Sequence, residues 1–103
     1  MILELADIRI HSGQQGAFDA AIQRGIAEVL SKSQGFIGCQ VHKGIESADR
    51  YILQVSWETL ENHMVDFRQS PAFAAWRAIV GPFFAGPPRV EHFNLLHPVG
   101  TNV

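Results

Sequence analysis

The chain has 103 residues, of which 47% are hydrophobic and 17% are charged, and its net charge is −2. This composition excludes a disordered chain, and the length suits a single core, so we expect one domain over residues 1–103. The negative charge and the lack of a basic run exclude binding driven by nucleic-acid phosphates, so we expect no nucleic-acid partner.

The first half of the chain is predicted to form a strand, a helix and two further strands. Residues 2–10 have the β-branched content of a strand. Apolar residues recur at helical spacing between about 14 and 33, which predicts a helix. Residues 36–43 and 51–57 are predicted strands, and the short polar connection between them indicates an antiparallel pair.

The second half is predicted to contain a helix broken in two. One side of its first piece carries four residues: Leu60, His63, Met64 and Phe67. Thr59 is the predicted cap of this piece. Ser70 is the predicted cap of the second piece, which Pro71 begins, since proline is tolerated at the first helical position. Pro87-Pro88 then turns the chain into a last strand over residues 89–96.

The order strand-helix-strand-strand-helix-strand predicts an α+β fold, the ferredoxin-like βαββαβ plan. This fold is a four-stranded antiparallel sheet with helices on one face. The strands over residues 51–57 and 89–96 lack the clean apolar-polar alternation of a sheet with one wet face. Because helices cover only one side, we expect a second copy of the chain to cover the other, which makes a homodimer.

The sequence favours a soluble cytoplasmic protein. Cys39 is the single cysteine, which excludes an intrachain disulfide and fits a reducing compartment. The N-terminus shows no export signal. No apolar run approaches the roughly 20 residues needed to cross a bilayer, so we expect no membrane partner.

Several segments together point to one family. They are Trp57 to Glu61, Phe67 to Phe73, and Val90 to Phe93 after Pro87-Pro88, with Gly13 ahead of a helix bearing Phe18. Over nearly the whole chain they resemble the antibiotic biosynthesis monooxygenase (ABM) domain, of the dimeric α/β-barrel superfamily. The resemblance implies that two chains pair as a dimeric α/β barrel. It leaves the substrate open, since the family includes cofactor-independent oxygenases of aromatic polyketides, haem-degrading enzymes and proteins without an assigned reaction.

The haem-degrading branch is disfavoured by residue type. That branch uses an asparagine on the first strand, a tryptophan on the second helix and a haem-ligating histidine. The corresponding positions here are Ala6, Phe67 and Arg77. None matches, and a guanidinium offers iron no lone pair. Haem degradation would therefore need His63 or His92 as an unrelated ligand.

His63 and His92 are the candidate catalytic residues. His63 shares the inward stripe of its helix, and His92 shares a strand face with Val90 and Asn94. Either imidazole has a suitable pKa for a general base near neutral pH. The alternative for each is a histidine satisfied by one hydrogen bond, at a helix edge for His63 or at an interface for His92.

Five residues are candidates for substrate binding: Arg68, Asn94, Trp57, Phe67 and Trp76. Arg68 or Asn94 could donate to a developing oxyanion, and the three aromatic residues could exclude water. The alternatives are an arginine that complements a helix dipole and aromatic residues that are ordinary core. The scattered histidines predict no metal site, and without a Gly-rich phosphate loop we expect no cofactor.

The leading functional hypothesis is a cofactor-independent monooxygenase that acts on a small aromatic or quinol-like compound with O₂. An alternative is a non-catalytic dimeric module that binds a small molecule in the same pocket. RNA binding shares this strand order, but YILQVSW lacks the basic and stacking residues of an RNA-recognition strand.

Overall fold

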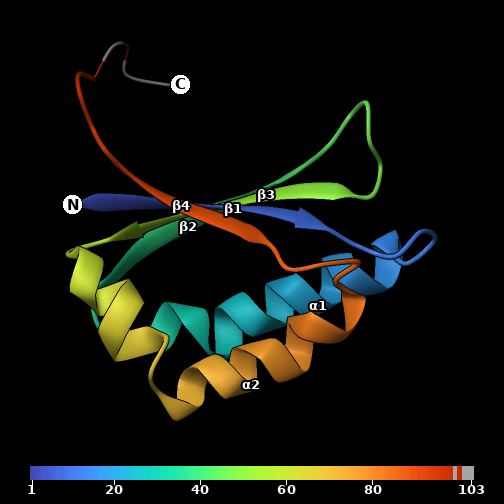
Figure 1. The fold of residues 1–103 in the computed structure, drawn as a ribbon, viewed down its shortest axis with the longest axis horizontal. Helices are drawn as coiled ribbons and strands as arrows, with labels where there is room; N and C mark the ends of the chain where they lie inside the picture. Colours follow the sequence, from blue (N-terminus) through green and yellow to red (C-terminus); the bar gives the residue numbers. More distant parts are fainter. Residues whose placement is uncertain (99, 101–103) are drawn as a thin grey trace.

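A four-stranded sheet carries helices on one of its faces (Figure 1). The computed structural model describes residues 1–98 and 100, so residues 99 and 101–103 of the predicted domain lie outside it. The strands are β1 (Ile2–Arg9), β2 (Phe36–Lys43), β3 (Arg50–Trp57) and β4 (Arg89–Asn94). They lie in the order β2-β3-β1-β4, and every neighbouring pair is antiparallel. This arrangement confirms the predicted ferredoxin-like α+β fold.

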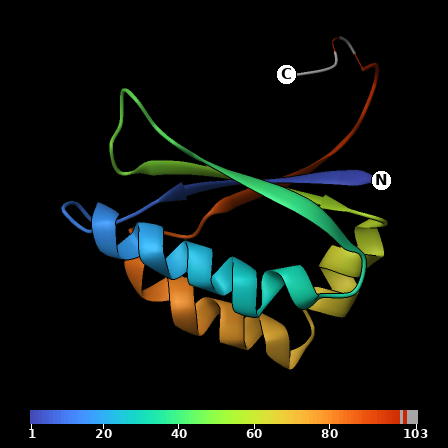
Figure 2. The same ribbon diagram turned by 180° about the vertical axis from the view of Figure 1, so that it is seen from behind.

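Both long helices pack on the same face of the sheet (Figures 1 and 2). α1 covers Gln15–Glu28 and is followed by a 3₁₀ turn, η1, over Leu30–Lys32. It ends earlier than predicted because the chain tightens to 3₁₀ geometry, as helices often do at their C-termini. α2 covers Pro71–Val80 and continues as a 3₁₀ turn, η3, over Gly81–Phe83. Among the described residues, no helix has the length and apolar character to cross a membrane.

β3 supplies the centre of the core because every second residue of this strand faces the helices. Its inward residues are at most 3% exposed: Tyr51, Leu53, Val55 and Trp57. Phe18 and Ile22 of α1 and Val80 of α2 close over them and are equally buried. The Tyr51 hydroxyl donates a hydrogen bond to Asp19 Oδ1 over 2.6 Å, which ties α1 to β3.

The segment between β3 and α2 is largely a π-helix, η2 (Asn62–Phe67), where the sequence spacing predicts an α-helix. The Arg68 amide donates to the His63 carbonyl over 3.0 Å, a bond that spans five residues. Three side chains of this segment are buried: Asn62, His63 and Phe67. Leu60 and Met64 are 39% and 37% exposed, so their predicted place on the inward side was wrong. The prediction failed because it assumed 3.6 residues per turn.

Thr59 and Ser70, the two predicted caps, act differently. Thr59 Oγ1 accepts a hydrogen bond from the Asn62 amide (3.1 Å), while Asn62 Oδ1 accepts one from the Thr59 amide (3.0 Å). Ser70 precedes Pro71 with an extended backbone, as predicted. Its hydroxyl, however, donates to the Phe67 carbonyl over 2.7 Å and does not cap α2. These bonds hold both ends of η2 and so fix where His63 lies.

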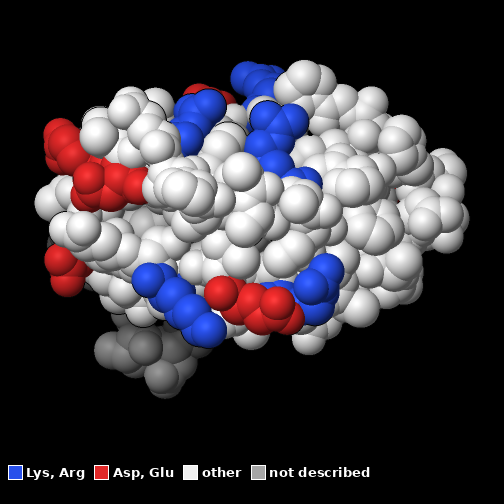
Figure 3. Space-filling model, turned by 90° about the horizontal axis from the view of Figure 1, so that it is seen from below, with Lys and Arg blue, Asp and Glu red and all other residues white. Residues whose placement is uncertain are grey.

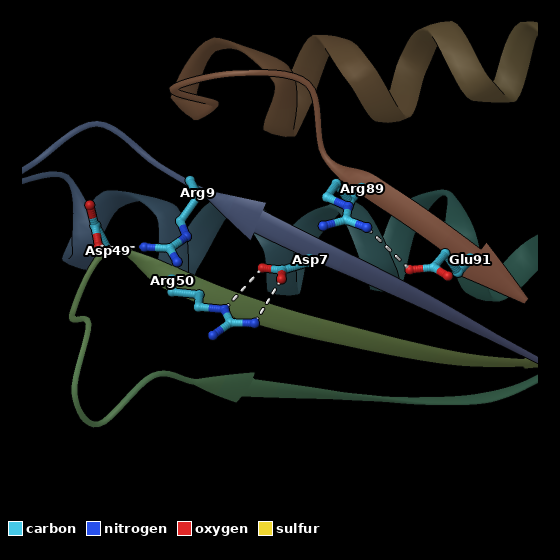
Figure 4. A network of polar contacts seen from close by, with 6 residues as sticks. All are labelled: Asp7, Arg9, Asp49, Arg50, Arg89 and Glu91. Atoms are coloured by element: carbon cyan, nitrogen blue, oxygen red, sulfur yellow. Dashed lines mark hydrogen bonds and ion pairs between the residues drawn. The ribbon is translucent and has the colours of Figure 1, made fainter.

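No helix of the described residues covers the opposite face of the sheet (Figure 1). One end of this face is ionic and holds three pairs: Asp7 with Arg50, Arg9 with Asp49, and Arg89 with Glu91 (Figure 4). The Asp7–Arg50 pair is bidentate, with N–O distances of 3.1 and 2.7 Å. The other end is apolar: Leu3 pairs in register with Phe93, which is 44% exposed, and Leu95 follows at 66%.

Candidate functional site

Glu4 and His92 lie side by side on the helix-facing side of the sheet. The register of β1 with β4 places them opposite one another, and opposed residues project to the same face. Trp57 is diagonal to Glu4, since its partner on β1 is Ile2. The indole Nε1 donates a hydrogen bond to Glu4 Oε1 over 2.9 Å. The carboxyl group is thus held inside the fold, and Glu4 is only 6% exposed.

His63 reaches the same carboxyl group from η2. Its Nε2 lies 3.3 Å from Glu4 Oε1, and its Nδ1 lies 2.8 Å from His92 Nε2. The His63 ring stacks on Trp57, with ring centroids 5.3 Å apart, and the residue is 4% exposed. Glu4, His63 and His92 therefore form a chain of three titratable groups, which we call the acid–imidazole cluster.

Burial shifts the pKa of every group in the cluster toward its uncharged form. Burial raises the pKa of Glu4 from 4.5 to about 7, although the Trp57 hydrogen bond and the charge of Arg68 oppose this rise. Burial, His92 and Arg68 lower the pKa of His63 from 6.5 to about 4. Burial and Arg68 also lower the pKa of His92. Burial therefore favours uncharged imidazoles in the cluster and keeps Glu4 protonated to a higher pH than an exposed carboxyl group.

A cavity of about 440 Å³ opens beside the cluster, and Glu4 and His63 form part of its wall. Four aromatic side chains also line it: Phe67, Phe73, Trp76 and Phe84. Arg68 and Arg77 also line it, with their guanidinium groups 5.7 and 5.9 Å from the centre of the Phe73 ring. None of the ion pairs among the described residues includes either arginine.

The helical side of the molecule presents few charges over its centre (Figure 3). In this view, basic side chains lie toward the upper and the lower edges, acidic ones lie at the left and between the lower basic ones, and the middle of the face is largely uncharged. The cavity therefore combines largely apolar walls with two arginines that form no ion pair among the described residues.

The structure places the predicted site residues in three different settings. Four of them line the cavity: His63, Phe67, Arg68 and Trp76. His92 lies behind His63 and outside the cavity wall, and Trp57 is fully buried against Glu4. Asn94 is exposed on β4, opposite Ile2, and does not line the cavity. The three positions compared with the haem-degrading branch all line it: Ala6, Phe67 and Arg77.

Glu4 is the functional candidate that the sequence analysis missed. The signal lies in the period of the first strand, where Glu4 shares a face with Ala6, Ile8 and Ile10. All three are at most 4% exposed. A carboxyl group in a row that must otherwise be apolar is costly to bury unless it has partners. Such a residue marks a polar site as clearly as an inward histidine does.

The geometry of the cluster suits proton exchange. Across residues 1–98 and 100, no group of three or more His, Cys, Asp or Glu side chains is arranged to hold a metal ion. Both ring nitrogens of His63 already face another titratable group. A carboxyl group with a pKa of about 7 can take or return a proton near neutral pH.

Replacing Arg68 with glutamine should raise the pKa values of Glu4, His63 and His92 together. The charge of Arg68 lowers all three, because it favours an ionised carboxylate and opposes an imidazolium. NMR titration of the histidine rings and of ¹³C-labelled glutamate measures the three values. Arg77→Gln is the matched control, since Arg77 lines the same cavity without acting on these pKa values. An unchanged His63 titration in Arg68→Gln would contradict this electrostatic role.

Comparison with known proteins identifies relatives of the chain. Residues 1–79 match the family model described as antibiotic biosynthesis monooxygenase. The uncharacterized protein YczJ of Bacillus subtilis is 36% identical over 94 residues, which are 91% of this chain and 98% of YczJ. A Bordetella bronchiseptica protein assigned to the same family is 41% identical, with a TM-score of 0.88 over 93% of this chain and 97% of its own. SnoaB, a cofactor-independent oxygenase from Streptomyces nogalater, shares the fold with a TM-score of 0.81 at 12% identity, over 97% of each chain.

Proposed function

Because this chain belongs to the antibiotic biosynthesis monooxygenase family, we propose that it is a cofactor-independent monooxygenase of a small aromatic compound, such as a quinol. The observation that carries the proposal is the acid–imidazole cluster in the wall of an aromatic cavity. The name of SnoaB, a cofactor-independent oxygenase of the same fold, supports a reaction of this class.

The cavity suits a flat aromatic ligand that acquires negative charge during the reaction. Its volume of about 440 Å³ lies within the range of small-molecule sites. Aromatic walls offer stacking surfaces and exclude water. Arg68 and Arg77 supply positive charge at the same cavity, where a phenolate or enolate would be stabilised.

The proposed reaction needs a base and charge stabilisation from the protein. Removal of an acidic substrate proton leaves an electron-rich anion, and this anion is the reductant of O₂. One oxygen atom ends in the carbonyl of the product. The other leaves as water with two hydrogens from the substrate, so the substrate supplies all the electrons.

The test is O₂ uptake with a panel of quinols and anthrones. We expect uptake that matches substrate consumption, and a decrease of about 10²-fold or more in kcat/KM for His63→Ala, because the acid–base cluster is broken. His42→Ala, at an exposed histidine on β2, is the control and should keep full activity. If ligands bind but no quinol or anthrone consumes O₂ above the blank, the cavity belongs to a binding module and the monooxygenase proposal fails.

We also propose that a second copy of the chain covers the helix-free face of the sheet. The apolar end of that face includes Leu3 and Phe93, and the chain after β4 leaves the sheet on that side (Figure 1). There Leu95 and Leu96 are 66% and 99% exposed. A two-fold pairing places this patch against its own copy.

Light scattering during size-exclusion chromatography tests this pairing. Phe93→Glu should give monomers, because it sets a charge in the apolar contact of each subunit. Val65→Glu is the matched control: Val65 is 46% exposed on η2, close to the 44% of Phe93, and its variant should remain dimeric. A wild-type chain that is monomeric at every concentration would refute the proposal.

A further inference from the structure

Glu4 differs from the two histidines in having an atom free to act on a ligand. Both ring nitrogens of His63 face other titratable groups, at 3.3 Å from Glu4 Oε1 and 2.8 Å from His92 Nε2. His92 does not line the cavity. Glu4 does line it, and only its Oε1 is engaged by Trp57 and His63. Glu4 Oε2 accepts no hydrogen bond from the described residues. Every fully buried side-chain oxygen or nitrogen atom of these residues has a hydrogen-bond partner, so Oε2 is not fully buried. It therefore keeps access to the cavity.

We propose that Glu4 is the residue that takes the proton from a phenolic ligand in this cavity, with His63 and His92 as positioning residues. The ligand class rests on the proposed function. In this step the ligand O–H bond breaks, its electron pair stays on the ligand oxygen, and a new O–H bond forms on Glu4. The charge moves from the carboxylate to the ligand oxygen, so the step is balanced and needs no oxidant.

Polar and charged groups on the neighbouring elements act on this transfer. Trp57 of β3 donates to Glu4, and His92 of β4 holds the far side of His63. Arg68, just after η2, and Arg77 of α2 line the cavity beside the ligand. When Glu4 is ionised, His63 Nε2 carries its proton toward Glu4 and His63 Nδ1 accepts from His92 Nε2–H. The two histidines therefore orient the carboxylate without contacting the ligand.

Anaerobic binding of 2-naphthol tests the proposal, because the naphtholate absorbs at longer wavelength than the phenol. The wild-type protein should give the naphtholate band at a pH where free 2-naphthol is neutral. Glu4→Gln should bind naphthol as the neutral phenol and lose at least 90% of the band, about a tenfold loss. Glu4→Asp, which keeps a carboxylate, should restore part of the naphtholate band. This recovery would show that the glutamine variant loses the band through loss of the carboxylate and not through a folding defect.

The positioning role has its own readout. His92→Gln should move the pH midpoint of the naphtholate band upward, since His63 then loses the partner that holds its tautomer. A role in folding alone would change the amplitude of the band and leave the midpoint in place. A midpoint equal to that of the wild type therefore overturns the positioning role.

The outcomes separate this inference from the monooxygenase proposal. A naphtholate band in the wild type that Glu4→Gln abolishes supports the inference even if no substrate consumes O₂, in which case only the monooxygenase proposal fails. A band that persists in Glu4→Gln assigns the base to another group and overturns the inference. A wild-type protein that gives no band, with or without naphthol bound, overturns it as well.

Discussion

Trp57→Ala is expected to lower the free energy of unfolding by about 3–5 kcal/mol, which is typical for truncating a buried aromatic residue. Trp57 is 0% exposed and stacks on His63, with Phe36 and Phe67 also in ring contact. Its loss opens a cavity and also removes the only indole donor to Glu4 that the described residues provide. Chemical denaturation followed by circular dichroism measures the change.

Trp57→Phe is the matched variant, because it keeps an aromatic ring and removes the N–H group. We expect a smaller loss, about 1–3 kcal/mol, from a buried acceptor left without its donor. The pKa of Glu4 should rise further, since the Trp57 hydrogen bond lowers it in the wild type. Equal stabilities of the alanine variant and the wild type would show that the indole does not support the core.

The second large effect is a pH dependence of stability that Glu4→Gln should reveal. A raised carboxyl pKa means that Glu4 favours folding at low pH, fully below about 4.5, and that this contribution is lost as pH rises through about 7. The shift corresponds to about 3 kcal/mol. His63 acts in the opposite sense: its contribution is full above 6.5 and is lost as pH falls toward about 4. Because solvent partly screens this site, the contribution of His63 to the free energy of unfolding is about 2 kcal/mol.

Between pH 4 and 7 the contributions of Glu4 and His63 change in opposite directions and largely cancel. The cluster should therefore change the stability of the wild type little over this range. In Glu4→Gln only the imidazole contribution remains, and the free energy of unfolding should fall by about 2 kcal/mol from pH 7 to pH 4. Urea denaturation at stepped pH measures it. His63→Gln should show the reverse, with stability falling as pH rises. Parallel pH profiles for wild type and both variants would contradict the opposed titrations.

The sequence predicts the sheet well because strand patterns depend on a period of two, which holds without a break along β3 and its pairing with β1. Residues 36–43 match β2 as predicted, and every second residue of β3 from Tyr51 to Trp57 is buried. The last strand is the exception: it was extended to residue 96 but ends at Asn94. Leu95 and Leu96 are apolar enough for a strand, yet β1 offers no further partner, since Asn94 already pairs with Ile2 near its start.

The site was only half predictable for a physical reason. His63 and Phe67 are four residues apart, so both α and π geometry leave them on the inner side, and their prediction survived a wrong helix type. The predicted inward placement of Leu60 and Met64 was wrong for the same reason. The period of the first strand could mark Glu4 as an inward carboxyl group, but only the pairing of β1 with β4 sets it beside His92, across 88 residues of chain. No local pattern carries such long-range information.

The π-helical turn of η2 has a consequence for how chemistry can vary within one architecture. A chain with one residue fewer between Leu60 and Phe67 could close this stretch as an ordinary α-helix, and side chains within the stretch would rotate by about 100° relative to α2. The imidazole would then leave the carboxyl group while the sheet, both long helices and their core stayed in place. Loss or gain of a single codon is thus a short evolutionary route between a reactive domain and an inert one.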